Sequence, residues 1–263
     1  MEISLNTSKW YDRLWAALIF FTRLPFWRIY QPKKEAYEGV VEFWPLAGWL
    51  TAGVMAGTLY VASMFFPYTI AVLLAIASRL LLTGALHEDG LADFFDGFGG
   101  GGSNRQRILD IMKDSHIGTY GVLSLIVYLL LLFFALYSLS PLIAALTILA
   151  VDPYAKMVSA QMIQMMPYAR TAETAKNKTV YRKFSMAAGI ALAVQGLLPI
   201  GLYLWWMKGA IDWSSLIFLP CLTMYFLYLL IWHRLRGYTG DCCGALFLLT
   251  ELTAYLVVVY FLV

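Results

Sequence analysis

The chain has 263 residues, of which 61% are hydrophobic and only 13% charged, with 19 Lys and Arg against 16 Asp and Glu. Soluble domains carry about 25% charged residues, so a soluble globular protein, a disordered chain and a coiled coil are excluded. A net charge of +3, with no run of basic residues, argues against a nucleic-acid partner. The composition predicts a protein that lies in the lipid bilayer.

Residues 1–39 are the first predicted unit. They contain six basic side chains and an apolar stretch of nine residues, 14–22, which lies between Arg13 and Arg23. Nine residues are too few to cross a bilayer, which needs about 20. We therefore predict a cytoplasmic N-terminal segment, residues 1–39, that carries an interfacial amphipathic helix.

Long uncharged runs follow this segment. Two of them are long enough for a pair of membrane-spanning helices each, and three more are about one bilayer long. The runs are 43–78 with a turn at Pro67, 115–151, 184–207, 213–233 and 243–263, the last interrupted only by Glu251. They predict an all-α, polytopic helix bundle of about seven transmembrane helices in a single domain, residues 1–263.

The basic residues gather in alternate connections between these helices. They lie in residues 1–39, 87–119 and 164–186 and just before the last helix, whereas the other connections hold at most Lys208. Positive charge marks the cytoplasmic side of a membrane protein. The N-terminus and the polar loops are therefore predicted to be cytoplasmic, and the C-terminus to lie outside.

The most informative stretch is acidic and begins at His87. If residues 86–96 continue the second transmembrane helix, Asp89, Asp93 and Asp96 share one helical face. Carboxylates repel one another unless they share a cation, and hard oxygen ligands suit Mg²⁺. The alternative is a solvated acidic loop, but residues 87–98 contain no Lys or Arg to pair with. The pattern favours a metal site.

The rest of this loop, up to residue 119, is basic as well as acidic. Arg105, Arg107 and Lys113 are candidates for neutralising phosphate charge, and Asp114 for completing a second metal site. The same basic residues could contact lipid headgroups, and the sequence leaves both interpretations open.

Further charges fall within or beside the predicted membrane helices. Asp241 lies between glycines at the start of the last helix, and Glu251 lies about three turns further in. Buried acids in membrane helices are costly and usually functional. Glu251 could instead pair with Arg79 or Lys156, and Asp152 with Lys156 at i and i+4.

Five motifs are spread along the chain: Phe21-Thr22-Arg23-Leu24-Pro25, residues 87–97, residues 111–121, Pro167-Tyr168-Ala169-Arg170 and Gly237-Tyr238-Thr239-Gly240-Asp241. Together they resemble the cobalamin synthase family, adenosylcobinamide-GDP ribazoletransferase, along nearly the whole chain. The resemblance implies a multi-pass enzyme of the cell inner membrane that joins adenosylcobinamide-GDP to α-ribazole, or to its 5′-phosphate. GMP would be released and Mg²⁺ required, and a monomer and a homo-oligomer both stay open.

We predict roles for individual residues from these acids and from the resemblance, with residues 87–119 as the cytoplasmic catalytic loop. The metal ligands are predicted to be Glu88, Asp89, Asp93 and Asp96. The catalytic residues are predicted to be the same three aspartates with Asp114, Lys113 and His87, where His87 is either a base or a structural residue. The predicted substrate-binding residues are Arg23, Arg105, Arg107, His116, Arg170 and Asp241.

Two other functions compete with this one. A CDP-alcohol phosphatidyltransferase would also place spaced aspartates over Mg²⁺, but its pattern has an Ala-Arg pair where this chain has Ala92 and Asp93. An ion-coupled transporter would use a site at the membrane midplane, made of Asp152, Lys156, Arg79 and Glu251. A scaffolding protein would leave the acidic cluster unexplained.

Overall fold

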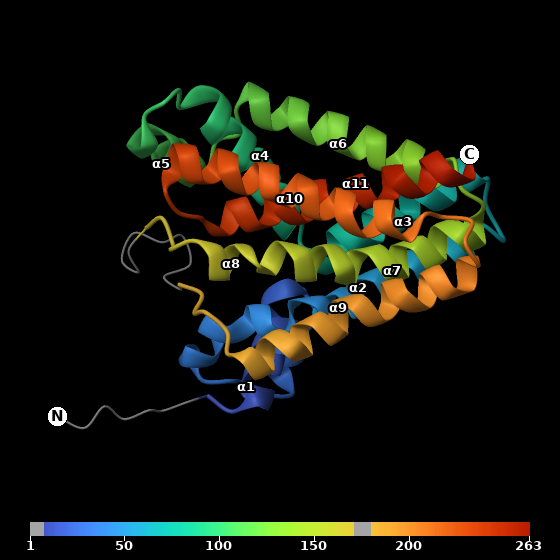
Figure 1. Ribbon diagram of the computed structural model, residues 1–263, viewed down its shortest axis with the longest axis horizontal. Helices are drawn as coiled ribbons and strands as arrows, with labels where there is room; N and C mark the ends of the chain where they lie inside the picture. Colours follow the sequence, from blue (N-terminus) through green and yellow to red (C-terminus); the bar gives the residue numbers. More distant parts are fainter. Residues whose placement is uncertain (1–7, 171–179) are drawn as a thin grey trace.

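We describe the protein from a computed structural model, over residues 8–170 and 180–263. Within these residues every regular element is a helix, and the one β-type pairing is an isolated bridge between Tyr168 and Tyr238. The long helices lie side by side along the long axis of the molecule (Figure 1). The predicted all-α membrane helix bundle is confirmed.

Six helical segments in the described part of the chain are long and apolar enough to cross a membrane. A seventh candidate consists of two helices, α3 (Tyr68–Thr83) and α4 (Leu86–Gly100), that are bent by 88°. The predicted number of about seven is reached when this bent pair counts as one span. The six are α2 (Trp44–Ala62) with the preceding 3-10 helix η2 (Lys34–Phe43), α6 (Thr119–Tyr137), α7 (Pro141–Ala160) with α8 (Met162–Met165), α9 (Met186–Met207), α10 (Trp213–Leu235) and α11 (Gly240–Leu262).

The bend between α3 and α4 corrects one prediction, since residues 86–96 do not continue the second transmembrane helix. The chain turns at Gly84 and Ala85, whose φ angles of 65° and 54° are left-handed. Glycine adopts this conformation without strain, whereas alanine does so at a cost. The Arg23 guanidinium packs against Gly84, and the backbone N–H of Arg23 donates to the Leu82 carbonyl at 2.7 Å. The N-terminal segment therefore supports the turn.

A helix is present near the N-terminus, where the apolar stretch predicted one. Helix α1 (Trp10–Phe21) exposes Trp10 and buries Ala16, Ala17 and Phe21. The 3-10 helix η1 (Phe26–Arg28) and η2 follow it and lead into α2. Through these connections α1 lies against η2 and the start of α2.

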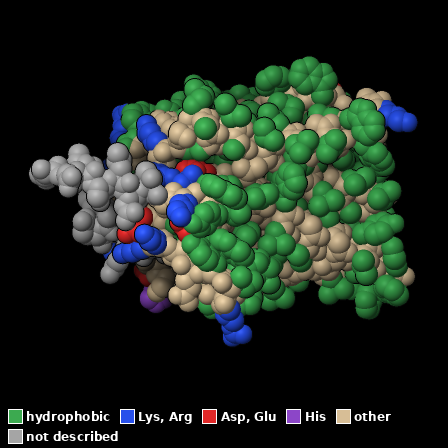
Figure 2. Space-filling view, turned by 90° about the horizontal axis from the view of Figure 1, so that it is seen from below, with side chains coloured by type: hydrophobic (Ala, Val, Ile, Leu, Met, Phe, Trp, Pro, Cys, Tyr) green, Lys and Arg blue, Asp and Glu red, His purple; other side chains and the backbone are tan. Residues whose placement is uncertain are grey.

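Helix α11 is at the centre of the bundle. It packs against α4, α6, α7 and α10, while α2 packs against α3 and α7, and α9 covers α7. The face in Figure 2 is hydrophobic over most of its length, and most of its charged side chains gather at one end. That end carries α5 (Arg105–Lys113) and the start of α11, and α11 ends at the opposite end (Figure 1).

The charged residues inside the bundle form pairs. Arg79 Nη1 lies 2.7 Å from Glu251 Oε1, and Arg79 Nη2 donates to the Tyr128 hydroxyl at 2.7 Å. Asp152 Oδ1 lies 2.5 Å from Lys156 Nζ. Of the two partners that the sequence left open for Glu251, the structure selects Arg79. These four residues, the alternative transporter site, are each engaged in an ion pair.

We expect the Arg79–Glu251 pair to be strongly coupled. Glu251→Ala leaves a buried guanidinium without its counter-ion and should lower the free energy of unfolding by about 3–5 kcal/mol. The double variant Arg79→Met/Glu251→Leu removes both charges and should recover most of this loss. SDS-induced unfolding in mixed micelles, followed by circular dichroism, measures both. Equal losses in the single and double variants would contradict the coupling.

Candidate active site

Two of the sequence motifs, separate in the chain, meet in a short backbone bridge. The Ala169 N–H donates to the Tyr238 carbonyl at 2.7 Å, and the Tyr238 N–H donates to the Pro167 carbonyl at 3.0 Å. A Cβ on Gly237 would lie 2.8 Å from the Pro167 carbonyl oxygen, so a side chain at this position would force the two bridged segments apart. The bridge holds residues 167–170 beside the N-terminus of α11.

A second close contact joins α4 to the first turns of α11. A Cβ on Gly90 would lie 3.2 Å from the Asp241 Cα, and one on Gly244 would lie 3.1 Å from the His87 carbonyl oxygen. Small residues let the backbones of two helices approach in this way. The contact brings the neighbours of Gly90 on α4 next to Asp241.

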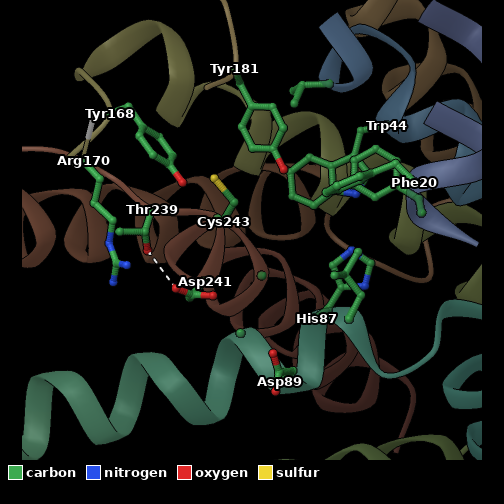
Figure 3. Close-up of a pocket in the computed structure, with 16 residues that line it drawn as sticks. Phe20, Trp44, His87, Asp89, Tyr168, Arg170, Tyr181, Thr239, Asp241 and Cys243 are labelled. Carbon is green, nitrogen blue, oxygen red and sulfur yellow. Dashed lines mark hydrogen bonds between the residues drawn. The ribbon is translucent and has the colours of Figure 1, made fainter. Parts of the chain in front are cut away.

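A cavity of about 210 Å³ opens where α1, α2, α4 and α11 meet Tyr168, Arg170 and Tyr181 (Figure 3). Its lining divides into two parts. Most of the side chains that carry charges or hydroxyls make the polar half, which consists of Asp89, Tyr168, Arg170, Thr239 and Asp241. Rings dominate the aromatic half, which consists of Phe20, Phe21, Trp44, His87 and Tyr181.

The polar half is organised around the start of α11. Thr239 caps this helix by accepting the Cys242 N–H at 3.3 Å, and its hydroxyl donates to Asp241 Oδ2 at 3.4 Å. Burial, followed by the charge of Asp241, raises the pKa of Tyr168 to about 12. Tyr168 is therefore a protonated hydrogen-bond donor at neutral pH.

Arg170 brings positive charge to this half. One of its terminal nitrogens donates to the Leu109 carbonyl at 2.6 Å, which orients the side chain from α5. Its buried Nε has no hydrogen-bond partner among the described residues. A guanidinium held in this way can offer its remaining N–H groups to an anion in the cavity.

In the aromatic half, His87 is enclosed by rings. Its ring lies 5.9 Å from that of Trp44 and 6.2 Å from that of Phe21, both nearly parallel, and 4.7 Å from the ring of Phe247. Both Trp44 Nε1 and His87 Nε2 are buried without a hydrogen-bond partner in the described part of the chain. Leaving such an atom unpaired costs about 1–3 kcal/mol.

The chain matches the model of the family described as cobalamin-5-phosphate synthase over residues 13–259. The chain belongs to the cobalamin-5-phosphate synthase family. Curated relatives named adenosylcobinamide-GDP ribazoletransferase include those of Leptothrix cholodnii, 39% identical over 91% of this chain and 92% of the relative, and of Vibrio cholerae serotype O1, 34% identical over 94% and 92%. A relative of the same name from Leptospira interrogans is 32% identical over 94% of both chains. No solved structure matches the chain.

The membership confirms the family that the sequence motifs predicted, and with it the prediction of an enzyme. Within the described residues of this member of the cobalamin-5-phosphate synthase family, Asp89, His87, Arg170 and Asp241 are the predicted site residues that line the cavity. They come from three separate motifs of the sequence, which the bridge and the α4–α11 contact bring together.

The four predicted metal ligands are not brought together. Asp96 accepts the N–H groups of Gly118 and Gly121 at 2.7 and 2.8 Å and so caps α6. Glu88 points to the buried charges, with its Oε1 3.8 Å from Arg79 Nη2. In residues 8–170 and 180–263, no three His, Cys, Asp or Glu side chains form a group that could hold an ion.

The remaining acids still fit a magnesium ion. Mg²⁺ is usually held by one or two carboxylates and completes its shell with water and substrate phosphates, so it does not require a cage of protein ligands. Asp89 borders the cavity on α4, and Asp93 follows one turn later on the same helix. Asp241 faces the cavity from the start of α11 (Figure 3).

Most of the predicted basic residues lie outside the cavity. Arg105 donates to the carbonyls of Leu235 and Ala169 at 2.7 and 2.6 Å, so it supports the backbone bridge. Arg23 lies at the turn between α3 and α4. Arg107 and Lys113 are exposed on α5.

Asp114 and His116 form an exposed pair beyond the end of α5. The His116 Nδ1 lies 2.7 Å from Asp114 Oδ1, which also accepts the His116 N–H at 3.0 Å. These hydrogen bonds hold the pKa of Asp114 below its ordinary value. Neither residue lines the cavity, so the structure places them apart from Asp89 and Asp241.

The site residues predicted from the sequence include His87 but no other residue of the aromatic half. Trp44 stands at the start of a membrane helix, where an aromatic residue is typical of a bilayer interface and signals no ligand. Phe20 belongs to the predicted interfacial helix, and Tyr181 lies in a polar connection. The packing of α1 against η2 and the start of α2 brings the rings of Phe20 and Trp44 to the cavity.

We expect Asp96→Ala to destabilise the protein, because it removes the acceptor that caps α6. Loss of such a cap lowers the free energy of unfolding by about 1–2 kcal/mol. Asp110→Ala is the matched control, since the carboxylate of this exposed aspartate on α5 accepts one hydrogen bond within the described residues, from Gln106. Its loss should stay within about 0.5 kcal/mol. SDS-induced unfolding compares the two variants, and equal losses would count against the capping role.

Proposed function

We propose that this protein joins adenosylcobinamide-GDP to α-ribazole, or to α-ribazole 5′-phosphate, with release of GMP. The product is adenosylcobalamin or its 5′-phosphate. The names of the curated relatives support this reaction. The observation that carries it for this chain is the meeting of Asp89, Asp241 and Arg170 around one cavity, where a pyrophosphate would find both a metal site and a guanidinium.

The reaction is a phosphoryl transfer, in which catalysis consists mainly of positioning and charge neutralisation. A hydroxyl of the ribazole attacks the phosphorus next to the cobinamide, a new P–O bond forms, and the bond to the GMP oxygen breaks. We propose that Asp241 accepts the proton of the attacking hydroxyl and that Arg170 donates to the phosphate oxygens.

Magnesium is the proposed cofactor, with Asp89 and Asp93 as its protein ligands. The bound ion would neutralise charge on the pyrophosphate. This choice keeps two of the four ligands predicted from the sequence and leaves out Glu88 and Asp96, whose carboxylates contact Arg79 and the α6 N-terminus. The two retained acids lie one turn apart on the helix that borders the cavity.

We further propose that the cavity faces the cytoplasm from the inner membrane. Its support is the asymmetry of charge, which Figure 2 displays at one end of the bundle. The connections at the opposite end, residues 63–67, 138–140 and 208–212, contain Lys208 as their one basic residue. Positive charge favours the cytoplasmic side.

We expect Asp89→Asn to abolish most of the transfer. The substitution keeps the shape of the side chain and removes the charge that holds the ion, so GMP release should fall by about 100-fold or more. The assay uses detergent-purified protein with adenosylcobinamide-GDP, α-ribazole and Mg²⁺, and omission of Mg²⁺ should have an equal effect.

The matched control for this assay is Asp110→Asn, an exposed aspartate on α5 outside the cavity. It should retain the wild-type rate within about twofold. A wild-type rate in Asp89→Asn would refute the metal site and leave the reaction standing. Absence of GMP release from the wild-type protein would refute the reaction itself.

The orientation has its own test. Lys113→Cys and Lys208→Cys each introduce a thiol at an exposed position, at opposite ends of the bundle. A membrane-impermeant maleimide should label Lys113→Cys in inverted inner-membrane vesicles, and Lys208→Cys only in right-side-out vesicles. The unmodified protein, with Cys221, Cys242 and Cys243, gives the background. The reverse pattern would overturn the proposed orientation.

A further inference from the structure

The aromatic half of the cavity has features that phosphate transfer does not require. The rings of Phe21, Trp44 and His87 are nearly parallel, with interplanar angles of 10° to 18° and centroids 5.5 to 6.2 Å apart. Phe20 stands edge-on to Tyr181 at 87° (Figure 3). Such a lining offers flat apolar faces and edges, which suit an aromatic ligand.

Besides the Tyr181 hydroxyl, two buried nitrogen atoms interrupt this apolar lining. Trp44 is 2% exposed and His87 is 4% exposed, and both line the cavity. Neither Trp44 Nε1 nor His87 Nε2 has a hydrogen-bond partner among the described residues. The indole N–H is only a donor, so its partner must be an acceptor. The ligand therefore has a flat ring with an acceptor atom on its edge.

Size narrows the ligand further. At about 210 Å³ the whole cavity is smaller than the roughly 300–1,000 Å³ of pockets for drug-sized ligands. It suits one fused ring with its sugar and is too small for a corrin ring. Three nucleoside portions of the proposed reaction contain such a base: the ribazole, the guanosine and the adenosyl group. The adenosyl group is bonded to the cobalt of the corrin ring, so the ribazole and the guanosine are the two that can enter without that ring.

The polarity of the lining distinguishes these two bases. Guanine presents an N–H and an amino group side by side, which pair best with a carboxylate. Among the described residues, the aromatic half holds no carboxylate or amide side chain: its acceptors are the His87 ring and the Tyr181 hydroxyl, and its other lining side chains are Val41 and Leu86. The base of α-ribazole is a methylated benzimidazole, whose one free ring nitrogen is an acceptor. A mostly apolar ring with a single acceptor matches a mostly apolar lining with a single obligate donor.

We propose that the aromatic half binds the benzimidazole base of α-ribazole, with the Trp44 N–H donating to its free ring nitrogen. This inference rests on the proposed function. The base then occupies the side of the cavity formed by α1, α2 and His87, and its ribose extends to Asp89 and Asp241 in the polar half. Trp44 and His87 determine which base is accepted, and they take no part in the transfer of the phosphate.

The test measures binding of α-ribazole to the full-length protein in nanodiscs by isothermal titration calorimetry, without the corrinoid. Trp44→Phe keeps a ring and removes the N–H, so the Kd should rise about tenfold, which is about 1.4 kcal/mol. Trp205→Phe is the matched control, because Trp205 is 79% exposed on α9 and lies outside the cavity. Its Kd should equal that of the wild-type protein.

A ligand analogue provides a second test, which uses the wild-type protein. The corresponding dimethylindole riboside has a C–H in place of the acceptor nitrogen, so the wild-type protein should bind it about tenfold more weakly than α-ribazole. Trp44→Phe should bind the two ribosides equally. Equal binding of both by the wild-type protein, or no measurable binding of α-ribazole, would overturn the subsite.

Titration of GMP tests whether guanine, instead of the benzimidazole, occupies the aromatic half. If Trp44→Phe weakens GMP binding and leaves α-ribazole binding unchanged, guanine occupies the aromatic half and the proposal is wrong. GMP release in the transfer assay separates the two levels of inference. If the wild-type protein releases GMP and Trp44→Phe binds α-ribazole as tightly as the wild type, the subsite is refuted and the reaction stands. If Trp44→Phe binds α-ribazole more weakly and the wild-type protein releases no GMP, the reaction is refuted and the subsite stands.

Discussion

The close approach of α4 and α11 is the constraint on which the rest of the site depends. Lipid provides no hydrophobic force between helices, so their association relies on small residues that let two backbones touch. Gly90 and Gly244 have this role, and a Cβ on either would press on the facing backbone. Because these glycines face each other, Asp89 and Asp241 border a single cavity although the sequence separates them widely.

Charge inside the bundle connects the same two helices to α3. Arg79 on α3 pairs with Glu251 on α11 and lies 3.8 Å from Glu88 at the start of α4. In an apolar interior such charges are costly unless they are paired. The pairing accompanies the 88° bend at Gly84 and Ala85, which turns α4 out of the direction of α3 and across the end of the bundle.

The cavity depends on parts of the chain that make different contributions. The bridge between Tyr168 and Tyr238 brings Arg170 to the polar half, and Arg105 supports this bridge through two backbone carbonyls. The rings of the aromatic half come instead from α1 and from Trp44 at the start of α2. Helix α1, which the sequence predicted as an interfacial helix, thus forms one wall of the cavity, and no single segment could form the cavity by itself.

The sequence by itself determined the membrane bundle and the family, because run length, composition and local motifs are properties of short segments. Its motifs also singled out Asp89, Arg170 and Asp241, which the structure places around one cavity. Only the tertiary structure decided that Asp96 caps α6 and that Trp44 lines the cavity. Spacing along a helix indicates which side chains share a face. Which neighbour that face meets depends on a turn in the chain and on helices distant in the sequence.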